Sequence, residues 1–234
     1  MPDTTLYRPH PQLFRTGDLV WVKRDDQFIA FSDAHPAQQV LATVQASAQA
    51  ALQQPDWSPQ QRQEIASWQP DPWSADIWVG HIGIIHMVQG QPWVIDATPS
   101  RHQPRIDGLP VPTNQPGVAV QTYAAWLSDS DHTTSHVWHG RVKMLSAIQA
   151  QATVDFARGH IGKAYRFLPW GFASNELFYC SELVWCAVRQ ASGIILDDIA
   201  STLRVDWFTP WMAMKSPHIE MLYAPPNRPY GGLS

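Results

Sequence analysis

The feature that most constrains this chain is a cysteine at the expected start of an amphipathic helix. Cys180 opens a segment, Cys-Ser-Glu-Leu-Val-Trp, with helical apolar spacing that runs to Gly193, a residue suited to ending a helix. A helix N-terminus carries a partial positive charge and N–H groups without acceptors, so a thiol placed there favours its nucleophilic thiolate form. The segment therefore predicts a helix with a candidate nucleophile, Cys180, at its first turn.

A candidate partner for this thiol lies far upstream, in a strand-like run around His81. Gly80 and Gly83 flank the histidine, and their missing side chains leave room for another element or a substrate to approach the ring. His86 falls on the opposite face of the same strand and is the weaker candidate. The alternative is a buried histidine that only hydrogen-bonds to backbone. A cysteine at a helix start facing a histidine on a strand is the layout of papain-like hydrolases.

Two aspartates compete to orient His81. If Gln89-Gly90 forms a two-residue hairpin loop, Asp96 lies opposite Gly83 and on the same face as the histidine. A carboxylate there would accept the second imidazole N–H and fix the tautomer. The alternative is a strand-end aspartate that caps the following turn. Asp18, in a Gly-Asp-Leu turn, is the rival acid, and its simpler role is to bond turn amides.

Oxyanion stabilisation has two sequence candidates. The backbone N–H of Cys180 or Ser181, at the start of the helix, would hold a developing negative charge. Tyr165 precedes the loop before Cys180, and its phenol would donate to the oxyanion or bind substrate. The alternative for Tyr165 is a half-buried aromatic with no chemical role.

A metal site is not expected. His132, His136 and His139 form a His-x-x-x-His-x-x-His cluster, but residues 129–135 resemble a polar loop, and no ligand motif such as His-Glu-x-x-His is present. We therefore expect a cofactor-free site.

The remaining segments suggest one domain, residues 1–234, with mixed helices and strands. A stretch rich in Ala and Gln, at about 34–70, predicts a helical insertion between two strands. The helix expected over 146–159 has Ser146 as its cap and an apolar face through Ile148. Other expected elements are strands at 17–22, 93–97 and 137–142, and a short strand followed by a short helix within 118–127.

Composition excludes several classes. The net charge of -4 and the charged fraction of 15% argue against a nucleic-acid partner. The 12 tryptophans fit an aromatic-rich core, or a groove for sugars or extended peptides. No apolar run reaches the ~18 residues of a transmembrane helix, and the first residues do not resemble a signal peptide. Two cysteines make no disulfide framework, and Cys186 is expected to be a small buried hydrophobe.

Taken together, these motifs resemble the permuted NlpC-type papain-fold amidases, the YiiX-like hydrolases. The matching pieces span nearly the whole chain apart from the insertion: Gly17-Asp18-Leu19-Val20, His81-Ile82-Gly83-Ile84, Val94-Ile95-Asp96-Ala97, Gly140-Arg141-Val142-Lys143, Ile161-Gly162-Lys163-Ala164-Tyr165 and Tyr179-Cys180-Ser181-Glu182-Leu183-Val184. The resemblance implies an α+β fold with a small antiparallel sheet or half-barrel packed on the cysteine helix. It also implies Cys180 as nucleophile, His81 as general base and Asp96 as orienting acid, where the family often has glutamate.

The expected function is that of a cysteine amidase or peptidase, and by resemblance its first-choice substrate is a peptide amide of bacterial peptidoglycan. Alternatives are a lipid or acyl-amide hydrolase or acyltransferase, and a non-catalytic binding module. A peptidoglycan amidase without an export signal suggests a cytoplasmic protein that a type VI-type system delivers to a target cell's periplasm. Such an antibacterial effector would have a cognate immunity protein covering the cleft between Cys180 and His81.

Overall fold

The computed structural model describes residues 6–23, 28–30, 76–78, 81–98, 117–128, 136–165, 177–196, 208 and 210–226. The expected helical insertion at about 34–70 and the expected loop at 129–135, with His132, lie outside these residues.

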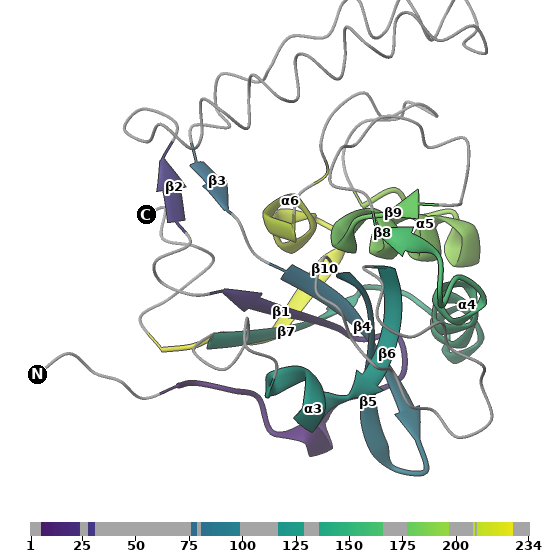
Figure 1. The fold of residues 1–234 in the computed structure, drawn as a ribbon, viewed down its shortest axis with the longest axis horizontal. Coiled ribbons are helices and arrows are strands. Elements are labelled where there is room, and N and C mark those ends of the chain that lie inside the picture. The colour runs from purple at the N-terminus through teal and green to yellow at the C-terminus, as the bar shows by residue number, and fades with distance from the viewer. Residues whose placement is uncertain are drawn as a thin grey trace, which may run out of the picture.

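Within the described ranges, one eight-stranded sheet forms the centre of the fold (Figure 1), in the order β10-β7-β1-β4-β5-β6-β8-β9. Neighbouring strands are antiparallel except for the parallel pair β8 and β9. The sheet is open, because β10 and β9 end the order. Its strands are β1 (Leu19–Lys23), β4 (His81–Val88), β5 (Gln91–Thr98), β6 (Gly117–Thr122), β7 (His136–Val142), β8 (Ala164–Tyr165), β9 (Leu177–Phe178) and β10 (Ile219–Tyr223), while β2 (Phe28–Ala30) and β3 (Asp76–Trp78) form a separate pair.

The described helices lie on both faces of the central sheet. They are the 3₁₀ turn η1 (Pro11–Leu13), α3 (Tyr123–Leu127), α4 (Ala147–Gly159), α5 (Cys180–Ser192) and α6 (Pro210–Lys215). In Figure 1, α4, α5 and α6 lie on one side of the sheet, and α3 lies on the other. This mixture of helices with a mainly antiparallel sheet confirms the expected α+β class.

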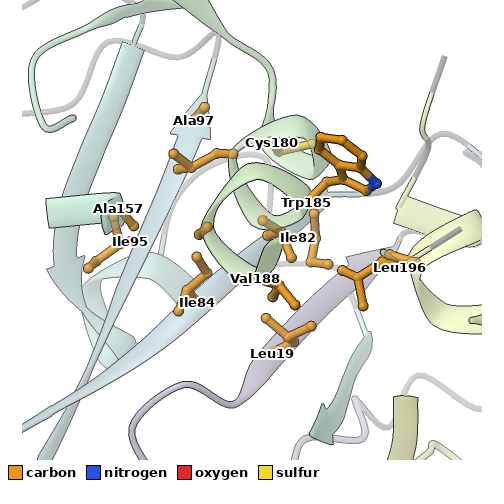
Figure 2. Packing of buried hydrophobic residues seen from close by; sticks show 14 of the residues in the cluster. Leu19, Ile82, Ile84, Ile95, Ala97, Ala157, Cys180, Trp185, Val188 and Leu196 are labelled. Carbon is orange, nitrogen blue, oxygen red and sulfur yellow. The ribbon is translucent and has the colours of Figure 1, made fainter. Parts of the chain in front are cut away.

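The alternation of side chains along the strands divides the core between the two faces. On the α5 side, Ile82 and Ile84 of β4 pack with Leu19 and Val188 (Figure 2), and the cluster extends to Cys180 and Trp185. On the α3 side a smaller cluster contains Val20, Ile85, Val94, Tyr123 and Trp126. No helix of the described residues is long and apolar enough to span a bilayer.

The predicted hairpin between β4 and β5 is confirmed, including its register. Val88 pairs with Gln91, and the loop residues Gln89 and Gly90 have φ angles of 50° and 81°. Positive φ at both loop positions is typical of a type I′ turn, whose twist matches that of the strands. The register then places Asp96 opposite Gly83.

The predicted helix ends are confirmed as well. Ser146 caps α4 by accepting a hydrogen bond from Gln149 N, and the Gln149 side chain accepts one from Ser146 N. Gly193 ends α5 in the left-handed conformation with φ 75°. The cysteine helix therefore begins at Cys180 and stops where the sequence predicts.

Candidate active site

The pair formed by His81 and Asp96 lies at the start of β4. The Nε2 atom of His81 is 2.7 Å from Oδ2 of Asp96, while 15% of the histidine side chain and none of the aspartate side chain is exposed. The confirmed register explains this contact, since Asp96 projects from the same face as His81 and is diagonal to it. The interaction holds one imidazole nitrogen and leaves Nδ1 for another partner.

That other partner is Cys180, at the first residue of α5. The cysteine is 7% exposed, and its side chain hydrogen-bonds with His81. α5 packs on β4 and β5, and this packing brings the start of the helix to the strand that carries the histidine. The structure therefore brings together the three residues that the sequence singled out.

The pKa of His81 reflects these neighbours. Burial alone lowers it, but the negative charge of the Cys180 thiolate, the hydrogen bonds with Asp96 and Cys180, and the charge of Asp96 raise the pKa to about 10. At neutral pH His81 consequently favours its imidazolium form. A positive charge beside a cysteine favours the thiolate, which is the reactive form of this side chain.

Tyr165 lies next to the cysteine through the short parallel pair of β8 and β9. Its partner in the pairing is Phe178, two residues before Cys180. Burial, and then the charge of Cys180, raise the pKa of the Tyr165 phenol, so it remains protonated at neutral pH. A protonated phenol near the thiol is a hydrogen-bond donor.

The Ser181 side chain has a structural partner. Its hydroxyl donates to the carbonyl oxygen of Phe208 over 2.5 Å, and the hydroxyl of Tyr179 accepts from Phe208 N at 3.3 Å. These bonds attach the segment before α6 to the start of α5. Any contribution of Ser181 to an oxyanion site would therefore come from its backbone N–H.

Sequence reasoning missed Trp126. This buried side chain of α3 donates its indole N–H to Oδ2 of Asp96 at 2.8 Å, the same oxygen that contacts His81. The strand and helix around Trp126 were expected, but a five-residue helix does not indicate where one of its side chains will point. No local signal identified the contact.

Asp18 lies in a different cluster from His81. Its Oδ2 atom is 2.7 Å from Nε2 of His139, and Arg141 donates to both carboxylate oxygens, at 2.6 and 2.9 Å. Asp18 also accepts from Arg15 N, which is the turn-amide role favoured for it. The backbone carbonyl of Asp18 accepts a hydrogen bond from the N–H of Ile85, which is four residues along β4 from His81, or roughly 13 Å. The structure thus does not bring Asp18 to His81.

Two histidines of the His132, His136 and His139 cluster, for which no metal site is expected, have other partners in the structure. His139 contacts Asp18, and Nδ1 of His136 accepts from Tyr7 N. Among the described residues, no group of three or more histidine, cysteine or acidic side chains is placed to hold a metal ion.

At Gly83 the strands β4 and β5 approach each other closely, and a substitution at this position tests how close the approach is. A Cβ at this position would lie 2.4 Å from Cγ1 of Val94 and 3.4 Å from Cβ of Asp96. We expect Gly83→Ala to reduce the free energy of unfolding by roughly 1–3 kcal/mol, because the β-branched valine cannot rotate away freely. Urea unfolding measures this change. Gly159→Ala is the matched control, since its Cβ meets nothing within 4 Å, and an equal loss there would contradict the steric explanation.

A cysteine at a helix start, a histidine on the adjoining sheet and a carboxylate behind it define the class of papain-like cysteine hydrolases. The model of the permuted papain-like amidases YaeF/YiiX, the C92 peptidase family, matches residues 63–216, more than half of the chain. The chain belongs to this family of permuted papain-like amidases, and it is accordingly a cysteine hydrolase of amides.

The chain was also compared with solved structures and with curated proteins. The crystal structure of the metalloprotein yiiX from Escherichia coli O157:H7 is 18% identical, with a TM-score of 0.48, and the match covers 89% of this chain and 96% of that one. No curated protein matches the sequence.

Proposed function

We propose that the chain is a cysteine amidase in which Cys180 is the nucleophile, His81 the general acid–base group and Asp96 the orienting acid. The observation that carries the proposal is the position of His81, hydrogen-bonded to Cys180 on one side and to Asp96 on the other. Asp96 occupies Nε2, so Nδ1 faces the sulfur. One domain over residues 1–234, with an insertion at about 34–70, is part of the same proposal.

The reaction follows from this arrangement. The thiolate of Cys180 attacks the amide carbonyl carbon, and the carbonyl oxygen becomes an oxyanion. The N–H groups of Cys180 and Ser181 are at the helix start, where a helix offers no internal acceptor, and together with the Tyr165 phenol they would hold this charge. The imidazolium of His81 protonates the leaving amine, and His81 then takes a proton from the water that hydrolyses the thioester.

For the substrate we propose a peptide amide of bacterial peptidoglycan, an assignment supported by the resemblance of the motifs to NlpC-type amidases. Incubation with purified sacculi, followed by mass spectrometry of the released fragments, tests it. We expect new amine and carboxyl ends within stem peptides or cross-links, and none with the Cys180→Ala variant. Cleavage of acyl esters or lipid amides, with sacculi left intact, would favour the lipid-hydrolase alternative instead.

We also propose that the protein acts as an antibacterial effector, delivered from the producer's cytoplasm to a target periplasm and neutralised in kin by an immunity protein. Expression in a bacterium without an immunity gene, with and without an added periplasmic signal, tests this role. We expect lysis only with the signal and only with an intact Cys180. Equal harmlessness in both compartments would remove the effector role and leave an amidase of another substrate.

The Asp96→Asn variant should change the pH dependence of amide cleavage. His81 must be protonated to supply the leaving amine, and its pKa of about 10 places the alkaline decline of the wild-type rate near that pH. The asparagine removes the charge of Asp96 and leaves only a neutral amide oxygen, a weaker acceptor for the imidazolium N–H. The pKa of His81 therefore falls, and the alkaline limb moves to lower pH. A profile of kcat against pH measures this shift, and an unmoved limb would show that Asp96 does not act on His81.

A further inference from the structure

We propose that Trp126 is a positioning residue of the same site, which holds the Asp96 carboxylate so that its Oδ2 stays directed at His81. This inference rests on the proposed roles of Cys180, His81 and Asp96, and it adds to them a residue of α3, which lies on the face of the sheet away from α5.

The first argument is the shared oxygen. Oδ2 of Asp96 receives the indole N–H of Trp126 at 2.8 Å and lies 2.7 Å from Nε2 of His81. A carboxylate turns about its terminal torsion between broad, weakly preferred orientations, so one contact with a histidine fixes it poorly. A second donor to the same oxygen favours the orientation that serves both partners. A charge-assisted hydrogen bond of this length is of the strong kind.

The second argument is the rigidity of the donor. Trp126 is 0% exposed, and its ring stacks on Tyr123 with centroids 6.1 Å apart. Tyr123 in turn meets the edge of Phe14 at 4.9 Å. The helix that carries both residues is capped by Thr122, whose hydroxyl accepts from Ala125 N. The indole N–H is therefore supported by packed aromatic rings rather than by a mobile surface loop.

The consequence reaches Cys180 through two contacts. When Asp96 is held, the His81 ring is held, and its Nδ1 remains directed at the sulfur. When the indole N–H is removed, Asp96 can turn away, the imidazolium spends less time beside the thiolate, and Cys180 becomes less reactive. The rings of Trp126 and His81 also lie near each other, with centroids 6.3 Å apart. Replacing the indole by phenylalanine keeps an aromatic ring there and removes the N–H, so the effect of the lost N–H acts through Asp96 and should disappear when Asp96 can no longer hold the histidine.

The test is the rate at which iodoacetamide alkylates Cys180 at pH 6.5, read by mass spectrometry of the peptide that contains it, so no substrate needs to be known. Trp126→Phe keeps an aromatic ring and removes the donor. We expect it to slow alkylation about tenfold, the factor that corresponds to one hydrogen bond to a charged group. In an Asp96→Asn background the same substitution should change the rate less than twofold, because the two residues act as one unit.

Control variants distinguish a failure of the inference about Trp126 from a failure of the proposed pairing of Cys180 and His81. Tyr123→Phe removes a polar group from the same short helix without touching Asp96, and it should leave the alkylation rate unchanged. If Trp126→Phe slows alkylation equally with and without the Asp96→Asn change, its role is structural and the inference is wrong. If His81→Ala does not slow alkylation either, the proposed pairing of Cys180 and His81 fails first. Thermal unfolding of each variant confirms that the rates refer to folded protein.

Discussion

Cys180→Ala is expected to remove amide cleavage, with a rate loss of at least about 10⁴-fold, since no other group in the site can form the thioester. The fold should persist, because the substitution deletes one small atom at a position that is already 7% exposed. Circular dichroism and the urea midpoint check the fold, and release of amine from peptide substrates measures the rate. Full activity in this variant would overturn the assignment of the nucleophile.

Cys186→Ala is the matched control for that experiment. Cys186 lies on the same helix and is a free, half-buried thiol, as Cys180 is a free, buried one. It packs against the main core, whereas the hydrogen bond with His81 comes from Cys180. We expect full activity from Cys186→Ala, so that a loss in the first variant reports the position of the thiol rather than the removal of sulfur from α5.

Much of the fold could be predicted because its signals are local. The hairpin loop Gln89-Gly90 sets the register of β4 and β5, and this register decides which face Asp96 takes. Ser146 and Gly193 mark helix ends through backbone chemistry that depends only on nearby residues. The hairpin loop alone is sufficient to predict that Asp96 shares a face with His81, and the other two signals locate the ends of α4 and α5.

What the sequence left open depends on contacts between distant segments. The predicted apolar face of α4 included Ile148, but Ile148 is 82% exposed, while Thr153 is buried with its hydroxyl bonded to Gln149 O. A threonine whose hydroxyl donates a hydrogen bond within its own helix can be buried without penalty. The spacing of apolar residues does not predict a buried threonine of this kind. Trp126 and Phe208 escaped notice for a similar reason, because both reach the site through hydrogen bonds from distant parts of the sequence.

The two candidate aspartates show most clearly which contacts could not be predicted from the sequence. Asp18 and Asp96 both lie near strand ends, and both contact a histidine at 2.7 Å. The pairing of β1 with β7 and with β4 places Asp18 beside His139, and this position lies away from Cys180 along the sheet. Only this pairing shows which histidine Asp18 contacts. Sequence reasoning favoured Asp96 through the hairpin register, while the partners of Asp18 depended on a strand more than a hundred residues away.

Asp18→Asn is expected to reduce stability strongly and leave the rate per folded molecule unchanged. Asp18 is 1% exposed, its charge is balanced by Arg141, and its carboxylate also contacts the ring of His139 at 2.7 Å. Removing one partner of such a buried group leaves the others uncompensated, at a cost of about 3–5 kcal/mol. Asp155→Asn makes the same chemical change in an exposed pair with Arg158, at 3.9 Å, and should cost less than about 1 kcal/mol.

The contribution of Asp18 to the free energy of unfolding should depend on pH, in a direction that follows from its pKa. Burial raises the pKa of Asp18, but the hydrogen bonds from His139, Arg141 and the Arg15 N–H outweigh it and hold that pKa below the ordinary aspartate value of 3.8. Its stabilisation is therefore present above pH 3.8 and is lost as the pH falls through the lower value in the folded protein. Urea unfolding across this range should show the wild type and Asp18→Asn converging at acid pH. A stable Asp18→Asn protein that fails to cleave amides would instead show that Asp18, and not Asp96, serves the catalytic histidine.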